Sequence, residues 1–338
     1  MQAQSLDRGG GGLSRIAIAA LLLALVIALG VSFGTEPISL GRAFSDPDSL
    51  DRVIALEVRL PRVLLGAVAG GGLAIVGCAF QAVLRNPLAE PYVLGVSGGA
   101  ALGATIAILA GLTGATLLGA SLVPIAALAG GLGATVLVYA LARVSGSSGG
   151  TSILLAGVVV NAIASAAITF LKTLVSASKA QELLYWLMGF LNVPSPRALG
   201  FVTAYVVAGS ALLLHDAGRL NLLALGDEPA QHLGVDVRAL ERRTFLACSL
   251  VVGAIVSVTG LIGFIGLIVP HALRRILGPD LRTLAPASLF VGGAVLVLCD
   301  MMSRALFRWL HTEPPVGAVT ALLGGPLFLL LLRRPARG

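Results

Sequence analysis

The sequence has little charge. Of its 338 residues, 12% are charged and 57% are hydrophobic, whereas soluble globular proteins carry about 25% charged residues. This composition excludes a soluble protein. Lysine is scarcest, since it occurs only at Lys172 and Lys179, and neither follows a glycine. A phosphate-binding loop needs Gly-Lys-Ser/Thr, so the chain does not hydrolyse ATP by the usual P-loop means. Any ATP-driven action requires a partner's nucleotide site.

Cysteine is also rare. Cys78, Cys248 and Cys299 lie inside apolar runs at no metal-ligand spacing, which argues against a zinc site and against a disulfide framework. We predict that they are small buried core residues. The net charge of +7 comes almost wholly from arginines scattered between apolar runs. That pattern argues against nucleic acid as a partner and is typical of membrane topology.

Long apolar stretches recur along the whole chain, and about 20 apolar residues suffice to cross a bilayer. We predict an all-α polytopic membrane protein with ten transmembrane helices in a single domain over residues 1–338, after a polar tail at 1–14. A poor cleavage site argues that the first helix is retained. The predicted spans are Ile16–Phe33, Val63–Leu84, Tyr92–Leu112, Leu117–Ala142, Ile153–Leu171, Leu199–Leu214, Phe245–Val258, Ile262–Leu277, Ala285–Ala305 and Val316–Leu332.

Two further segments do not cross the membrane. Gln181–Leu191 is too short and is predicted to be a surface or re-entrant helix. The longest internal polar segment, residues 220–243, contains Asp227-Glu228-Pro229 and later Gly234, which predict two short helices forming a docking surface. An even number of spans places both termini on one side. If that side is the cytoplasm, 14 of the 23 Arg and Lys residues lie inside, in the direction of the positive-inside rule.

Some residues within the spans have structural interpretations. Glycines at four-residue spacing let helix backbones approach closely. Asp300 and Arg304 stand four apart on one helix face, where a mutual ion pair lowers the cost of burying either. Gln81 and Asn161 are uncharged polar residues, which more often bridge helices than bind ligand. The glycine sets are Gly66 and Gly70, and Gly95, Gly99 and Gly103.

Two other functions are weighed. Gly95-Val96-Ser97-Gly98-Gly99, with His271 on another helix, matches the G-x-S-x-G pattern of serine hydrolases. That serine needs a strand before it, whereas Ser97 begins a glycine-rich helix. An ion-coupled secondary transporter is the main alternative, but it needs intramembrane carboxylates, and Asp300 is the only acidic residue well inside a predicted span.

Four blocks in order carry a resemblance to a known family. Residues 59–62 (RLPR), 86–91 (NPLAEP), 94–100 (LGVSGGA) and 263–271 (GFIGLIVPH) resemble the permease family of iron-siderophore, haem and vitamin B12 importers. The similarity extends from about residue 13 to 335. The blocks do not identify the chelate, because relatives that carry different chelates share them.

The resemblance implies a type II ABC importer permease fold. A ten-helix subunit pairs with a second copy around a translocation path, surrounded by membrane lipid. Two ATP-binding cassette subunits lie beneath it, and a periplasmic substrate-binding protein docks above. The assembly moves a metal chelate into the cytoplasm across the cell inner membrane, with both termini cytoplasmic. The chain itself is then a transport subunit without catalytic residues, a metal site or a cofactor.

The resemblance also implies roles for particular residues. Arg59, Arg62 and Arg304 match arginines that the vitamin B12 permease offers to glutamates of its binding protein. The cytoplasmic gate is formed by Asn86, Leu88, Thr151 and Ser152. The residues implied in ATPase coupling are Leu225, Gly226, Asp227, Glu228, Ala230, Leu233 and Gly234.

Overall fold

The computed structural model describes residues 8–112, 116–117, 120–144, 150–193 and 195–333. Over these ranges the fold is all-α, as predicted, apart from a two-stranded ribbon of two residues each, β1 (Thr116–Leu117) and β2 (Ala120–Ser121). The helices are α1 (Arg8–Ser32), α2 (Leu40–Ser45), α3 (Leu50–Arg52), a π-helical segment (Val53–Arg59), α4 (Leu60–Val83), a 3₁₀ turn (Pro91–Leu94), α5 (Val96–Leu109), α6 (Leu122–Val144), α7 (Gly150–Thr173), α8 (Ala177–Met188), α9 (Pro196–His215), α10 (Ala217–Leu223), α11 (Asp227–His232), α12 (Val237–Thr259), α13 (Ile265–Leu277), α14 (Leu281–Leu310) and α15 (Val316–Arg333).

Among the described residues, seven helical runs are long and apolar enough to cross a membrane. One of them is the continuous run Leu50–Val83, which contains α3, the π-helical segment and α4. The other six are α1, α6, α7, α9, α12 and α14. This confirms a polytopic helical membrane protein. The other three predicted spans correspond to α5, α13 and α15, which are shorter than these seven.

Two of the short helices begin where the backbone turns sharply. Gly95 has φ +84° and separates the 3₁₀ turn from α5. Gly260 and Phe264, at φ +66° and +69°, separate α12 from α13. Glycine adopts this left-handed conformation without steric cost, whereas phenylalanine rarely does. Apolar sequence therefore continues through points where the helices are interrupted.

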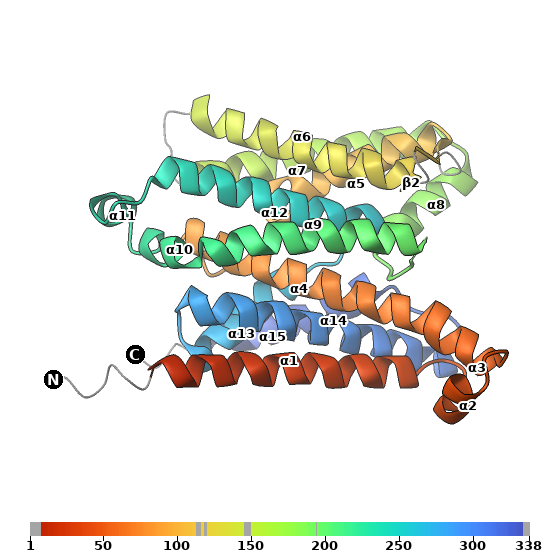
Figure 1. The fold of residues 1–338 in the computed structure, drawn as a ribbon. Coiled ribbons are helices and arrows are strands. Elements are labelled where there is room, and N and C mark those ends of the chain that lie inside the picture. The colour runs from red at the N-terminus through yellow and green to blue at the C-terminus, as the bar shows by residue number, and fades with distance from the viewer. Residues whose placement is uncertain (1–7, 113–115, 118–119, 145–149, 194, 334–338) are drawn as a thin grey trace.

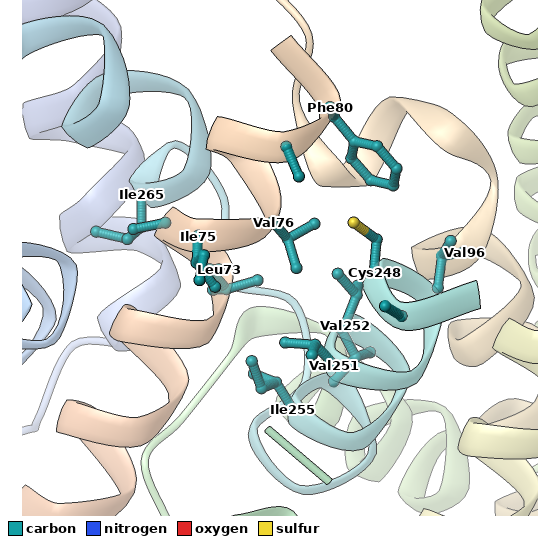
Figure 2. Close-up of a cluster of buried hydrophobic side chains, with 14 of the residues drawn as sticks. Leu73, Ile75, Val76, Phe80, Val96, Cys248, Val251, Val252, Ile255 and Ile265 are labelled. Atoms are coloured by element: carbon teal, nitrogen blue, oxygen red, sulfur yellow. The ribbon is translucent and has the colours of Figure 1, made fainter. Parts of the chain in front are cut away.

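Helix α4 forms the centre of the bundle, and its residues 69–83 are all buried. It packs against α14 on one side and α9, α12 and α13 on others. Figure 2 shows Val76 and Phe80 of α4 facing Cys248 and Val252 of α12 within one apolar cluster. The predicted burial of the three cysteines is confirmed, since all three are buried and free.

The four-residue glycine spacing packs helices, as predicted. A Cβ added at Gly70 would lie 2.3 Å from the backbone oxygen of Gly292 on α14. One added at Gly99 would lie 2.4 Å from the oxygen of Gly130 on α6. No real Cβ tolerates such contacts, so these helix pairs approach closely only because both partners are small.

The bundle has two different ends (Figure 1). One, here the coupling end, holds α10, α11 and the start of α1; the other, here the arginine end, holds α2, α3 and α8. A short helix is present near the predicted one, but α8 runs from Ala177 to Met188 instead of from Gln181 to Leu191. The two predicted short helices are confirmed as α10 and α11. The predicted helix start at Phe245 is wrong, because α12 begins at Val237 and includes the last part of segment 220–243.

Candidate gate, coupling surface and arginine cluster

The surface that is predicted to contact an ATPase, here the coupling surface, consists of α10, α11 and the turns beside them. Gly226 (φ +131°) and Gly234 (φ +83°) bound α11. Ala230 is buried against the bundle, whereas the side chains of Leu225 and Leu233 are 68% and 60% exposed. Exposed apolar side chains grouped on a turn of defined shape are typical of a protein interface.

Acidic residues begin α11. Asp227 and Glu228 occupy its first turn, where a negative charge is favourable beside the free N–H groups. Asp227 also forms an ion pair with Arg85, which follows α4. The surface is therefore tied to the end of the central helix.

The loop at residues 84–90 contains the predicted gate residues Asn86 and Leu88, is here called the gate loop, and turns back after α4. The side-chain oxygen of Asn86 accepts a hydrogen bond from the N–H of Leu88 at 2.9 Å. The N–H of Ala89 donates to the backbone oxygen of Asn86 at 3.0 Å. These two bonds shape a compact turn around Asn86, and they leave the Leu88 side chain 45% exposed.

The second half of the predicted gate lies in the first turn of α7. Thr151 belongs to this helix, but its side chain lies outside the described part of the structure. Ser152 is partly buried. The pairing of these residues with Asn86 and Leu88 stays a prediction.

Arg59 and Arg304 lie at the arginine end and are 5% and 3% exposed. Each donates from Nη1 to backbone oxygens at the end of α1 over 2.7 to 3.2 Å. The last carbonyls of a helix have no partner within the helix, so the two guanidinium groups satisfy them. The acceptors are Gly30 and Phe33 for Arg304, and Val31, Ser32 and Glu36 for Arg59.

Asp300, which is fully buried, lies between two arginines. Its Oδ1 accepts from Nε of Arg62 at 2.9 Å. Nε of Arg304 lies 3.0 Å from its Oδ2, close enough for charge attraction although not aligned as a hydrogen bond. Arg62 also donates to Glu313 at 2.9 Å. The predicted pair of Asp300 and Arg304 is confirmed, and Arg62 and Glu313 extend it into a network.

Gln81 and Asn161 bridge elements, as predicted. Nε2 of Gln81 donates to the oxygen of Leu267 at 3.3 Å, joining α4 to α13. Nδ2 of Asn161 donates to the oxygen of Tyr92 at 2.6 Å, and its Oδ1 accepts from the N–H of Gly98 at 3.1 Å. Asn161 therefore holds α7 against the turn that starts α5.

Glu90 stabilises the break before α13. Its Oε1 accepts from the N–H of Phe264 at 2.7 Å, and the hydroxyl of Tyr92 accepts from the N–H of Ile262 at 2.8 Å. Burial raises the pKa of Glu90, and the hydrogen bond from Phe264 partly opposes this rise. Sequence reasoning missed this contact, because no spacing rule relates residues 174 positions apart.

A pocket of about 680 Å³ lies beside α8 at the arginine end. Its size is that of ligand pockets in general, which are concave and mostly apolar. The ends of α5 and α12, the start of α6 and residues 190–193 complete its walls, so no single stretch of sequence signals it. Its most polar and aromatic lining residues are Glu182, Tyr185, Trp186, Phe190, Asn192 and Thr259.

The described residues form a bundle of long apolar helices with exposed leucines on short helical turns at one end, the architecture of a polytopic membrane protein. The chain belongs to the FecCD transport family, whose model matches residues 21–334. It is therefore a permease subunit of an ABC transporter.

Known proteins support this assignment over nearly the whole chain. The cobalamin import system permease of Halobacterium salinarum is 45% identical over 282 residues, 83% of this chain and 74% of the relative. The hemin transport system permease of Yersinia pestis is 38% identical over 317 residues, 93% and 94% of the two chains. A solved structure described as an inward-facing conformation of a metal-chelate type ABC transporter matches with a TM-score of 0.83 at 29% identity, covering 94% and 98%.

Proposed function

We propose that this chain is the membrane subunit of an ATP-driven importer that moves a metal chelate of the cobalamin, haem or iron-siderophore class from the periplasmic side into the cytoplasm. The observation that carries the proposal is the 45% and 38% identity to permeases named for cobalamin and hemin. The pocket of about 680 Å³ beside α8 supports it, because its aromatic walls suit a large, partly apolar ligand.

In this proposal the subunit crosses the inner membrane ten times, with α5, α13 and α15 as the three shorter crossings, and its termini are cytoplasmic. Two ATPase subunits dock on α10 and α11, one for each copy in a homodimer. The exposed leucines of the coupling surface support this assignment. Apolar exposed side chains on α7 and α15, such as Ile163 and Leu322 at 62% and 75%, suit a second copy or lipid.

The proposed gate is the path narrowed by Asn86, Leu88, Thr151 and Ser152. Short polar and small apolar groups restrict passage without holding the chelate tightly. The exposure of Leu88 on a compact turn supports a role for the gate loop in this constriction.

The proposed docking site for an acidic periplasmic binding protein is the cluster of Arg59, Arg62 and Arg304. Within it the side chain of Arg62 is 19% exposed, so it is the member best placed to meet a carboxylate directly. Arg59 and Arg304 are buried next to Arg62 and bind the backbone at the end of α1. Changing Arg62 to Gln should slow association of the binding protein at low salt, with the difference shrinking at high salt. An unchanged rate at low salt would remove Arg62 from the docking site.

The function is tested by reconstitution with an ATP-binding cassette subunit and a periplasmic binding protein from the same organism. Proteoliposomes are loaded with ATP or with a non-hydrolysable analogue, and uptake of cyanocobalamin, haem and a ferric siderophore is measured. We expect one of these classes of chelate to accumulate inside the proteoliposomes that contain ATP, and not inside those that contain the analogue. Accumulation driven by an ion gradient without ATP would overturn the proposal in favour of a secondary transporter. The structure argues against that outcome, because Asp300 is neutralised by two arginines.

A further inference from the structure

We propose that Arg85 is the positioning residue that transmits movement of the coupling surface to the gate loop. The inference rests on the proposed function, which assigns the ATPase to α10 and α11 and the gate to Asn86 and Leu88. It concerns a residue that the sequence resemblance leaves without a role.

The backbone at Arg85 is the first observation. Arg85 has φ +47°, in the left-handed region. The N–H of Asn86 donates to the oxygen of Gln81 at 3.2 Å, and that of Arg85 to Ala82 at 3.3 Å. This pair of bonds is the common helix end at which glycine occupies the left-handed position. An arginine there carries backbone strain that glycine would not.

The side chain supplies the reason for an arginine. Its Nε donates to the oxygen of Leu223, the last residue of α10, at 3.0 Å. Its Nη2 forms an ion pair with the carboxylate of Asp227, the first residue of α11. One planar guanidinium therefore bridges both sides of the break at Gly226. A guanidinium can direct donors to two acceptors at once, whereas a lysine ammonium is a single point charge.

The gate loop is held at both ends. Arg85 fixes its start to α10 and α11, and Glu90 fixes its end to the N–H of Phe264 at 2.7 Å. Asn86 and Leu88 lie between these two attachments. A short segment attached at both ends must follow its anchors, so displacement of α10 and α11 relative to α4 displaces the gate residues.

Stability alone does not explain this link. The side chains of Arg85 and Asp227 are 38% and 44% exposed, and ion pairs in contact with water contribute little to stability. If Arg85 has only a structural role, replacing it should therefore leave the amount of chelate moved per ATP unchanged. If Arg85 couples the two segments, replacing it should lower that amount.

The test uses Arg85→Gly in the full reconstituted transporter, because glycine relieves the backbone strain while removing the link. We expect normal assembly, continued ATP hydrolysis and at least a fivefold fall in chelate moved per ATP. Arg42→Ala is the matched control, since Arg42 forms a comparable ion pair with Asp51 at the opposite end; it should leave the ratio unchanged.

The charge exchange Arg85→Glu/Asp227→Arg gives a second readout. The double variant should move more chelate per ATP than Arg85→Glu alone, because the reversed ion pair again joins the gate loop to α11. A wild-type ratio in Arg85→Gly, or an exchange no better than Arg85→Glu, would overturn the inference. If instead the wild-type complex moves no chelate with ATP, the proposed function itself fails.

Discussion

Arginine is used differently at the two ends of this bundle. At the arginine end, Arg59 and Arg304 are buried and bound to backbone oxygens. At the coupling end, Arg85 is partly exposed and joins neighbouring elements. A buried guanidinium that loses its partners is left uncompensated, whereas one in contact with water loses little. The arginine end is therefore a framework whose stability depends on its buried charges, whereas the arginine of the coupling end contributes little to stability and instead links one element to another.

The largest effect should come from removing the central anion of the framework. Asp300→Ala leaves the buried guanidinium of Arg304 and the partly buried guanidinium of Arg62 without their shared carboxylate, which should lower the free energy of unfolding by about 3–5 kcal/mol. Unfolding of the purified protein in detergent measures this. Glu313→Gln is the control, because Glu313 is 31% exposed and should matter much less. Equal stability of Asp300→Ala and wild type would mean that the end is not fixed by charge.

A smaller effect should follow from disturbing the helix pair that carries the framework. Gly70→Ala places a methyl group 2.3 Å from the Gly292 oxygen, so α4 and α14 must separate. Overpacking of this kind costs about 1–3 kcal/mol. Gly325→Ala is the control, because a Cβ there meets nothing within 4 Å. If both variants unfold alike, the close approach of α4 and α14 does not stabilise the fold.

The third prediction concerns pH at the gate loop. The pKa of Glu90 is raised in the folded protein, so the folded state binds this proton more tightly than the unfolded state. The stability that it contributes is full below the unfolded pKa and is lost as pH rises through the folded pKa. Glu90→Gln should remove this dependence, and unfolding measured across mildly acidic to neutral pH compares it with wild type. If the free energy of unfolding of the two proteins changed with pH in the same way, the prediction would be contradicted.

The smallest stability effect is expected for an exposed pair. Arg42 lies 2.9 Å from Asp51, but its side chain is 73% exposed, so Arg42→Ala should change the free energy of unfolding by at most about 0.2–1 kcal/mol. The same unfolding assay measures it. A loss as large as that of Asp300→Ala would erase the distinction between buried and exposed arginines.

Local rules predicted the local features. Asp300 and Arg304 pair because four residues make one helical turn, and the breaks at Gly226 and Gly234 were marked by the residue type that favours them. Long-range partners were not predictable. Arg62 reaches Asp300 across 238 positions, and that contact exists only once α4 and α14 have packed.

Residue type also misled where it opposes the observed backbone. Phe264 and Arg85 adopt left-handed φ angles that their side chains disfavour, so the sequence predicted helix ends at Leu84 and Val258 but not these two backbone conformations. In both cases a distant group stabilises the conformation, Glu90 for Phe264 and α10–α11 for Arg85. The family resemblance therefore implied gate and coupling residues, which stay predictions, but not the contacts that connect their segments.

The end of α1 has a consequence for how the chain is made. Its last carbonyls find their donors in Arg59 and in Arg304, and Arg304 lies on α14, the second-to-last helix described. The apolar face of α1 also packs there, with Val26 near Ala294 and Val297. During synthesis the carbonyls of Val31 and Ser32 can meet Arg59 early, whereas those of Gly30 and Phe33 meet Arg304 only after α14 has been made. The contacts at the end of α1 are therefore completed only when α14 packs against it.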